Sequence, residues 1–175
     1  MTYDHNMIYL PDEDSIFLLD TIIDIPARSM LDMGTGTGYV AINYKRAHPD
    51  SRVVGADISS EAIELARANA KREGVNIEFV VSDLFSNIDE KYQMIVFNAP
   101  YIPDDGMDYD VTVIDRGVVK RFMTDVRNYL LPGGIAFLLV NNLTEIVNDG
   151  SWELYRVKHM FFEELRIYKY HQLNF

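Results

Sequence analysis

The chain has 175 residues, the usual size of one domain, of which 48% are hydrophobic and 25% charged. That composition is typical of a globular protein and excludes disordered, collagen-like and low-complexity chains. The sequence contains no cysteine, which excludes a disulfide scaffold, a thiolate zinc site and a cysteine nucleophile. With 27 acidic and 16 basic residues the net charge is -11, which disfavours binding to nucleic-acid backbones and anionic membranes.

The sequence carries no recognisable targeting or membrane segment. Its first ten residues lack a basic stretch followed by an apolar core, so no secretory signal is expected. The longest strongly apolar run, Ile135–Val140, is far shorter than the roughly 20 residues that span a bilayer. We therefore expect a cytoplasmic protein that forms a single domain over residues 1–175, with residues 1–25 as an N-terminal segment that contains a helix.

Helical and strand patterns alternate along the chain. Amphipathic spacing predicts helices at Asp14–Ile23, Tyr39–Ala47, Ser60–Glu73 and about Asp115–Leu131. Apolar runs predict strands at Ser29–Met33, Arg52–Ala56, Ile77–Val81, Tyr92–Phe97 and Ile135–Val140, with a closing pair at Leu154–Met160 and Glu164–Tyr170. The last helix should end at Pro132-Gly133-Gly134. This order implies an open α/β fold, whose mostly parallel sheet is covered on both faces and binds its ligand at the carboxyl ends of the first strands.

A glycine-rich loop follows the first predicted strand. Asp32-Met-Gly34-Thr-Gly36-Thr-Gly38 leads into the next helix, and Asp57 closes the second strand 19 residues after Gly38. Glycines allow a sharp turn and the close approach of a ligand. Asp57 is then placed to accept hydrogen bonds from a ribose diol. We predict that Asp32, Gly34, Gly36, Gly38 and Asp57 bind a nucleoside-containing cofactor.

This loop departs from the common phosphate-binding patterns. The dinucleotide fingerprint needs its third glycine where Tyr39 stands, and no Gly-Lys-Ser/Thr follows to make a P-loop. Asp32 would also bring a carboxylate close to a pyrophosphate, which is unfavourable. A carboxylate at that place suits a ligand with an ammonium group, such as the methionine part of S-adenosylmethionine.

With these motifs the chain resembles the seven-stranded class I methyltransferases that use S-adenosylmethionine. Ser82-Asp83-Leu84-Phe85 follows the third strand, where such enzymes place an acid against the adenine amine and an apolar residue against the ring. The resemblance implies a Rossmann-like fold of seven mostly parallel strands, with helices on both faces and an antiparallel closing strand. It also implies S-adenosyl-L-methionine as the cofactor, bound in part by Asp83 and Leu84.

Asn98-Ala99-Pro100-Tyr101 ends the fourth strand and resembles the Asn-Pro-Pro-Tyr motif of enzymes that methylate planar nitrogens, such as glutamine amides and the exocyclic amine of adenine. Ala99 stands in place of the usual first proline. Our hypothesis is that the Asn98 side-chain oxygen and the Ala99 carbonyl accept the two N–H bonds of the acceptor nitrogen, while Tyr101 stacks on the planar group. Asn98 would also contact the cofactor. Methyl transfer would then depend on positioning, and no metal is expected.

The N-terminal segment narrows the resemblance to one branch. Tyr9-Leu-Pro-Asp-Glu-Asp-Ser-Ile-Phe-Leu-Leu19 resembles the Tyr-x-Pro-x-Glu-Asp-Ser/Thr-x-Leu-Leu segment of the small HemK-like methyltransferases. These include archaeal and eukaryotic enzymes that modify the glutamine of the Gly-Gly-Gln motif in class 1 release factors. The resemblance implies a cofactor contact from Ser15, a release factor as protein substrate, and a small zinc-binding activator subunit that adds a strand to a hydrophobic sheet edge. Asp108–Gly117 follows the family's glycine-rich substrate loop only loosely.

Other functions remain open at this point. The acceptor could be the exocyclic amine of adenine, or another base, in RNA or DNA, or it could be a lysine of a protein. A nucleic-acid substrate requires a basic track, whereas four charges on one helix are more typical of a solvated face. The four at helical spacing here are Arg116, Lys120, Arg121 and Arg127. A non-catalytic cofactor-binding partner subunit is the third reading, but the Asn98–Tyr101 motif argues against it. The leading hypothesis is an N-methyltransferase that acts on a protein glutamine.

Overall fold

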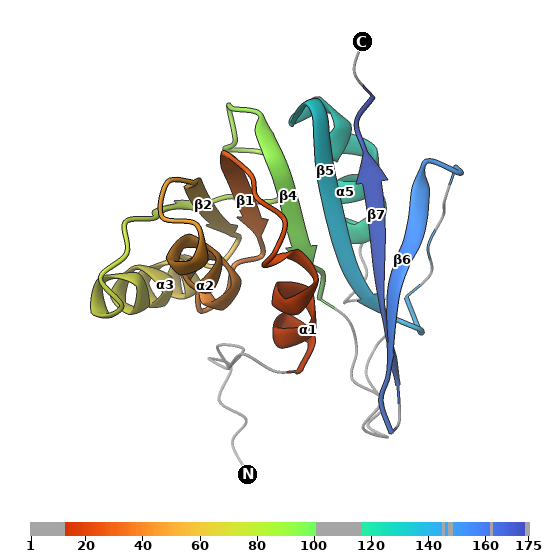
Figure 1. Cartoon of the computed structure of the whole chain (residues 1–175), viewed down its shortest axis with the longest axis horizontal. Coiled ribbons are helices and arrows are strands. Elements are labelled where there is room, and N and C mark those ends of the chain that lie inside the picture. Colours follow the sequence, from red (N-terminus) through yellow and green to blue (C-terminus); the bar gives the residue numbers. More distant parts are fainter. Residues whose placement is uncertain (1–12, 101–116, 145, 147–148, 162, 174–175) are drawn as a thin grey trace.

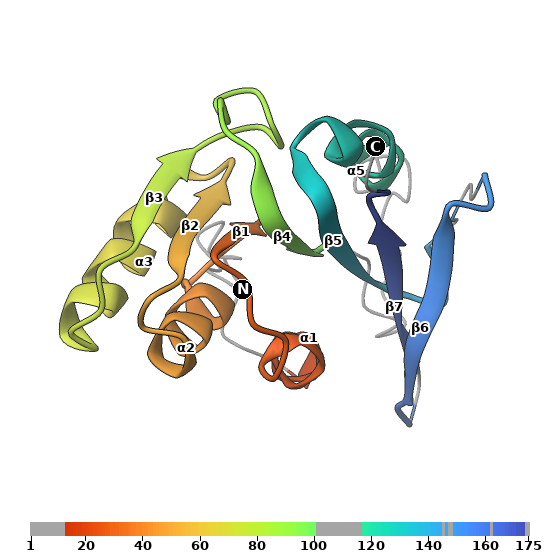
Figure 2. The same cartoon turned by 45° about the horizontal axis from the view of Figure 1, so that its top comes forward.

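The computed structural model describes residues 13–100, 117–144, 146, 149–161 and 163–173. They form one seven-stranded sheet with the strand order β3-β2-β1-β4-β5-β7-β6 (Figures 1 and 2). Strand β7 is antiparallel to both of its neighbours, and all the other pairings are parallel. The predicted Rossmann-like sheet is therefore confirmed. Its strands are β1 (Ser29–Met33), β2 (Arg52–Asp57), β3 (Glu78–Val81), β4 (Tyr92–Asn98), β5 (Leu130–Asn141), β6 (Trp152–His159) and β7 (Glu164–His171).

Helices cover both faces of the sheet. Helices α1 (Glu13–Ile22), α2 (Tyr39–Ala47) and α3 (Ser60–Arg72) lie on one face, and α5 (Val118–Asp125) lies on the other (Figures 1 and 2). Side chains of a strand point alternately to opposite faces. In β4, Met94 and Val96 accordingly pack with the residues of α1 and α2, while Ile95 and Phe97 join the core beneath α5.

The ends of α3 follow the local signals of the sequence. The Ser59 hydroxyl accepts a hydrogen bond from the backbone N–H of Ala62 at 3.2 Å, which satisfies one of the donors left open at a helix start. Gly74 follows the helix with a φ of 68°, in the left-handed region that favours glycine. Between these ends the buried residues of α3 are Ala62, Ile63, Ala66 and Ala70, and the last three join a core cluster with Phe79 of β3.

The predicted helix at Asp115–Leu131 is wrong at its carboxyl end. Helix α5 ends at Asp125, a short 3-10 turn covers Val126–Asn128, and β5 already begins at Leu130. Pro132-Gly133-Gly134 therefore lies inside a strand and does not end a helix. The N–H of Gly133 donates to the Gln172 carbonyl, and the N–H of Gln172 donates to the Gly134 carbonyl, so this stretch is held by pairing with the chain that follows β7. Residues 115 and 116 lie outside the described part of the chain.

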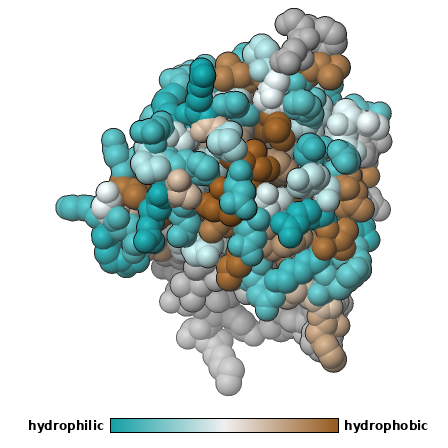
Figure 3. Space-filling view, viewed as in Figure 1, coloured by the Kyte–Doolittle hydropathy of each residue, from teal (hydrophilic) through white to brown (hydrophobic). Residues whose placement is uncertain are grey.

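Charged and polar groups dominate one face of the molecule. On the face seen in Figure 3, hydrophilic side chains predominate and apolar ones show between them near the centre. None of the helices in the described part of the chain is long and apolar enough to cross a membrane.

Gly134 gives a test of the corrected strand. A Cβ at this position would lie 2.8 Å from the Leu131 carbonyl oxygen and 3.1 Å from that of Gln93, and backbone atoms cannot move aside cheaply. We expect Gly134→Ala to lower the free energy of unfolding by about 1–3 kcal/mol in urea denaturation, as overpacking does. Leu131→Ala, at a side chain that is 39% exposed in the same strand, is the matched control and should change it by less than about 0.5 kcal/mol. An equal loss in both variants would contradict the close backbone approach.

Candidate active site

A pocket of about 390 Å³ opens at the carboxyl ends of the parallel strands. The loops after β1, β2, β3 and β4 form its floor and walls, and the first turns of α1 and α5 close two of its sides. This is the place that the fold class predicts for a ligand. The residues that line it are Asp14, Ser15, Asp32, Met33, Gly34, Thr35, Gly36, Thr37, Tyr39, Val40, Asp57, Ile58, Ser82, Asp83, Leu84, Phe97, Asn98, Ala99, Pro100 and Val118.

The glycine-rich loop brings backbone directly to the pocket. Gly34 and Gly36 line it with φ angles of 64° and 54°. A Cβ on Gly34 would lie 2.9 Å from the Phe97 ring, so glycine is required where the loop passes the end of β4. At Gly36 a Cβ would meet nothing within 4 Å, so space remains there for a ligand.

Gly38 has a different place from the other two glycines. Its Cβ would approach the Ala66 Cβ and the Ile42 Cδ1 at 3.2 Å each, and Gly38 is not among the residues that line the pocket. The glycine thus allows α2 to begin close against α3. Its predicted contact with the cofactor stays a prediction.

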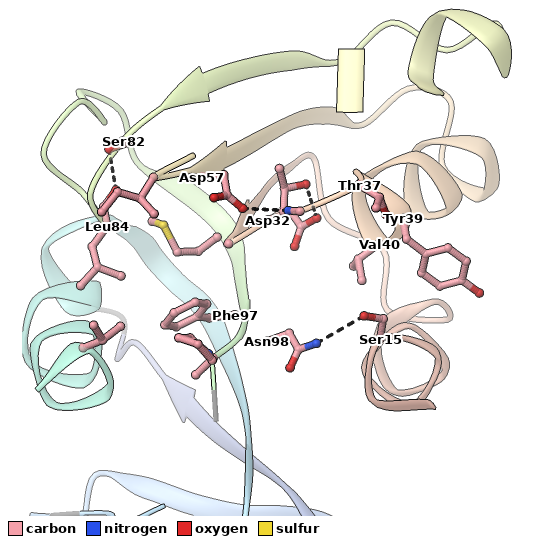
Figure 4. A pocket seen from close by; sticks show the side chains of 18 of the residues that line it. Ser15, Asp32, Thr37, Tyr39, Val40, Asp57, Ser82, Leu84, Phe97 and Asn98 are labelled. Carbon is pink, nitrogen blue, oxygen red and sulfur yellow. Dashed lines mark hydrogen bonds between the residues drawn. The ribbon is translucent and has the colours of Figure 1, made fainter. Parts of the chain in front are cut away.

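Asp57 ends β2 and lies in the upper middle of Figure 4, between Ser82 and Asp32. Its Oδ2 accepts a hydrogen bond from the N–H of Gly36, and its Oδ1 accepts one from the N–H of Ser59, each at 2.9 Å. A carboxylate offers about four lone-pair sites, so each oxygen can accept a further hydrogen bond from a ligand hydroxyl. The two backbone bonds hold the carboxylate in one orientation, which suits the predicted contact with a diol.

Asp32 lies at the end of β1 and is 2% exposed. Its Oδ2 accepts hydrogen bonds from the Thr35 hydroxyl at 2.7 Å and from the N–H of Ala41 at 3.1 Å. The second bond satisfies a donor in the first turn of α2, whose N-cap, Gly38, has no side chain to do so. Burial raises the pKa of Asp32 to about 7, against the opposing effect of these two hydrogen bonds, and the nearby Asp57 adds to the increase.

The segment after β3 forms a tight turn around a buried serine. Ser82, 2% exposed, donates its hydroxyl to the Leu84 carbonyl at 2.6 Å and accepts from the N–H of Asn87. Leu84 has a φ of 48°, in a left-handed conformation that non-glycine residues seldom adopt. Strain of this kind gathers at functional sites. It turns the Leu84 side chain to the pocket, opposite Ser15 in Figure 4, as the predicted contact with a base ring requires.

Asn98 is the last residue of β4 and lies between the two ends of the pocket (Figure 4). Its Nδ2 donates to the Ser15 hydroxyl at 3.3 Å, which leaves its Oδ1 buried and without a hydrogen-bond partner among the described residues. Leaving a buried acceptor unsatisfied costs about 1–3 kcal/mol, so such an atom marks a ligand position. Ala99 and Pro100 also line the pocket. Tyr101 lies outside the described residues, and its predicted role stays a prediction.

The structure adds lining residues that sequence reasoning missed. Asp14 is 2% exposed beside Ser15, while Ile58, next to Asp57, is 70% exposed at the pocket. Both stand beside residues of recognised motifs, and that adjacency is the signal that could have found them. Phe97 and Val118 reach the pocket from β4 and α5, and their apolar patterns show only that they are core positions.

Comparison with known proteins decides the family. A sequence model of the methyltransferase small domain matches residues 9–149, which is most of the chain. The chain belongs to the methyltransferase small domain family. This confirms the predicted methyltransferase activity, and with it the predicted S-adenosylmethionine cofactor.

Relatives of this methyltransferase carry related names. A putative protein N5-glutamine methyltransferase of Methanocaldococcus jannaschii is 38% identical over 149 residues, which cover 80% of this chain and 75% of the relative. Release factor glutamine methyltransferases of Streptococcus pneumoniae and Koribacter versatilis are 36% and 30% identical, over 63% and 86% of this chain. The matched parts make up only 44% and 62% of those two bacterial proteins.

Solved structures share the fold. The 16S rRNA N2 G1207 methyltransferase of Thermus thermophilus, in complex with AdoMet and guanosine, matches 95% of this chain and 45% of its own length, with a TM-score of 0.74 and 18% identity. An RNA methyltransferase of Salinibacter ruber, in complex with S-adenosyl-L-homocysteine, matches 94% of this chain and 93% of its own, with a TM-score of 0.65 and 21% identity. At these identities the likeness supports the fold alone.

Asp32 makes the stability of the ligand-free enzyme depend on pH. Its pKa of about 7 in the folded chain exceeds the 3.8 of the unfolded one, so the folded state holds the proton more tightly. The stability that this proton contributes is complete below pH 3.8 and is lost as the pH rises through about 7. The neutral isostere Asp32→Asn does not ionise, and its amide oxygen can still accept both hydrogen bonds.

We expect Asp32→Asn to gain stability over the wild type as the pH increases from 4 to 7, and to keep a constant lead above that. The shift corresponds to about 4 kcal/mol at most. Urea denaturation followed by the fluorescence of Trp152, the single tryptophan and 4% exposed, measures it. A difference between the two proteins that stays the same at every pH would show that the pKa of Asp32 is not raised.

Proposed function

We propose that this methyltransferase transfers the methyl group of S-adenosylmethionine to the side-chain amide nitrogen of a glutamine in a protein, with a translation release factor as substrate. The observation that carries the proposal is the Oδ1 of Asn98, a buried acceptor in the pocket without a partner among the described residues. An amide nitrogen brings N–H donors that would satisfy it. The names of the relatives that cover most of this chain support the same acceptor.

The cofactor fits the pocket with its two ends in different surroundings. Asp57 would accept from the ribose hydroxyls, and Asp83 and Leu84 would contact the adenine. At the other end the buried carboxylate of Asp32 would face the ammonium group of the methionine part. Both hydrogen bonds that the described residues give to Asp32 end on Oδ2, so Oδ1 remains for that contact. When bound, the cofactor supplies an electrophilic methyl group on a sulfonium ion.

Asn98 and Ala99 would prepare the acceptor nitrogen. The lone pair of an amide nitrogen is delocalised into its carbonyl, which makes it a poor nucleophile. Two acceptors that hold its hydrogens, the Oδ1 of Asn98 and the carbonyl of Ala99, favour a pyramidal nitrogen whose lone pair points at the methyl carbon. Tyr101 would stack on the planar amide. The N–C bond would form as the S–C bond breaks, S-adenosylhomocysteine would leave, and the nitrogen would then lose one proton to water.

Ser15 would position Asn98 for this step. Its hydroxyl accepts from the Nδ2 of Asn98, which directs the Oδ1 of the same amide away from α1. Correct orientation of reacting groups can supply about 7–11 kcal/mol of a reaction barrier. A serine on a separate helix thus fixes which end of Asn98 meets the substrate.

The pairing of basic residues and the net charge favour a protein substrate over RNA or DNA. Of the four basic residues at helical spacing, Arg121 pairs with Asp83 at 2.7 Å and Arg127 pairs with Asp149 at 3.5 Å. Arg116 lies outside the described residues. Cations already paired with carboxylates are poor contacts for phosphates, and the net charge of -11 opposes them further. Lysine methylation remains the alternative within protein substrates, and a release factor would place the enzyme in the cytoplasm.

A small zinc-binding activator is also part of the proposal. Within the described part of the chain, the sheet ends in β3 on one side and β6 on the other. Val81 of β3 is 41% exposed, and Leu154, Tyr155 and Val157 of β6 are exposed as well. Unpaired strand edges with apolar side chains are suitable for the addition of a strand from a partner.

Asn98→Ala tests the chemistry. We expect methyl transfer to fall by at least about 100-fold, since an acceptor that acts on the reacting nitrogen is lost, while the Kd for S-adenosylhomocysteine stays within a few-fold. Asp57→Ala is the matched variant at the other end of the pocket and should weaken cofactor binding instead. Radiolabel transfer and calorimetry measure the two effects. Normal turnover of Asn98→Ala would remove Asn98 from the mechanism.

The acceptor can be identified directly. Incubation of the enzyme with labelled S-adenosylmethionine and either purified release factor or total RNA, each followed by mass spectrometry, should place the label on a glutamine of the protein. The activator, where needed, is supplied by repeating the assay in cell extract. Label in RNA alone, or on lysine, would overturn the choice of glutamine.

A further inference from the structure

Helix α5 packs against the core beside the part of the pocket where adenine would bind. Phe122 is fully buried, and its ring lies 5.7 Å from that of Phe85 and 4.9 Å from that of Phe97, measured between centroids. One turn earlier Val118 lines the pocket itself. A helix held in this way has little freedom to shift, so the side chains of its outer face have defined positions over the turn that follows β3.

Arg121 reaches from this helix to Asp83. Its Nη2 donates to Oδ1 at 2.7 Å and its Nη1 donates to Oδ2 at 3.3 Å, so the guanidinium engages both carboxylate oxygens. The hydrogen bonds and charge of Arg121 lower the pKa of Asp83. The two side chains are about half exposed, at 48% and 47%. Such a pair contributes little to folding stability, but its fork geometry fixes the orientation of the carboxylate.

We infer that Arg121 is a positioning residue that sets the base specificity of the cofactor site. It holds the Asp83 carboxylate so that a remaining lone pair can accept from the exocyclic amine of adenine. An ionised carboxylate can only accept hydrogen bonds. It therefore favours a base with an amine at that place and repels one with a carbonyl oxygen there, such as hypoxanthine. The inference rests on the proposed cofactor site and is independent of the methyl acceptor.

The backbone around Asp83 is already fixed by other groups. The Ser86 hydroxyl accepts from the N–H of Asp83 at 3.1 Å, and Ser82 holds the Leu84 carbonyl. What these contacts leave free is the rotation of the Asp83 side chain, which is half exposed. Among the described residues, Arg121 is the group that restrains that rotation. Without it we expect the carboxylate to spend part of its time turned into solvent, and the amine contact to weaken accordingly.

The test compares two cofactor products that differ at one place on the base. Calorimetry with S-adenosylhomocysteine and with S-inosylhomocysteine, which carries a carbonyl in place of the amine, gives a preference ratio for each variant. Asp83→Asn should reduce the wild-type preference by at least about tenfold, the worth of a hydrogen bond to a charged group. Arg121→Ala should reduce it by about fivefold, the upper range for an exposed pair, mainly through weaker binding of S-adenosylhomocysteine. In the Asp83→Asn background Arg121→Ala should have no further effect.

Controls separate positioning from a structural role. Arg127→Ala removes an arginine with a similar exposed ion pair, to Asp149, that does not reach the pocket, and its preference should equal that of the wild type. Arg121→Lys keeps the charge without the fork and should give an intermediate preference. An unchanged preference in Arg121→Ala, an equal loss for both ligands, or additive effects with Asp83→Asn would each overturn the inference. Wild-type binding of S-adenosylhomocysteine with no methylation of release factor would refute the proposed substrate alone.

Discussion

The buried carboxylate of Asp32 is the constraint on which the pocket depends. It joins three pieces of chain that the sheet alone would leave separate: the end of β1, the glycine loop through Thr35, and the first turn of α2 through Ala41. The cost of this arrangement is a carboxyl group removed from water, as its raised pKa shows. A cationic ligand group beside it would relieve that cost, so the carboxylate that shapes the loop would also provide part of the affinity for the cofactor.

The rest of the pocket follows from the position of that loop. Once its turn is set, the N–H of Gly36 meets Asp57 at the end of the neighbouring strand, and the loop lies against Phe97 at the end of β4. The parallel order β2-β1-β4 places those two strand ends on either side of β1. Helix α1 then completes the other end by bringing Ser15 to Asn98. Binding of the cofactor and orientation of the acceptor group thus use adjacent parts of one rigid edge.

Much of this could be predicted from the sequence, because its signals are local. The bounds of Ser29–Met33 and Tyr39–Ala47 agree with β1 and α2, since a short apolar run, a glycine cluster and amphipathic spacing each act over a few residues. The prediction of the carboxyl end of α5 failed because the signal that decides it is not local. Proline and glycine normally end a helix, but here the backbone groups of Gly133 and Gly134 are hydrogen-bonded to Gln172, nearly forty residues later. The pairing of Arg121 with Asp83 and the fitting of Gly38 against Ala66 likewise join residues that no local pattern connects.

Ala99 is the clearest departure from the family's pattern, and the structure gives it a physical reason. Its backbone N–H donates to the Leu139 carbonyl at 3.1 Å, which extends the pairing of β4 with β5 by one residue beyond Asn98. A proline has no N–H and could not make this bond. The methyl side chain is 2% exposed, so it fills core space. What the proposed chemistry takes from this position is the carbonyl oxygen, which alanine and proline share. Alanine in place of proline therefore changes how the end of β4 is held, but it keeps the carbonyl oxygen that would accept the hydrogen bond from the substrate.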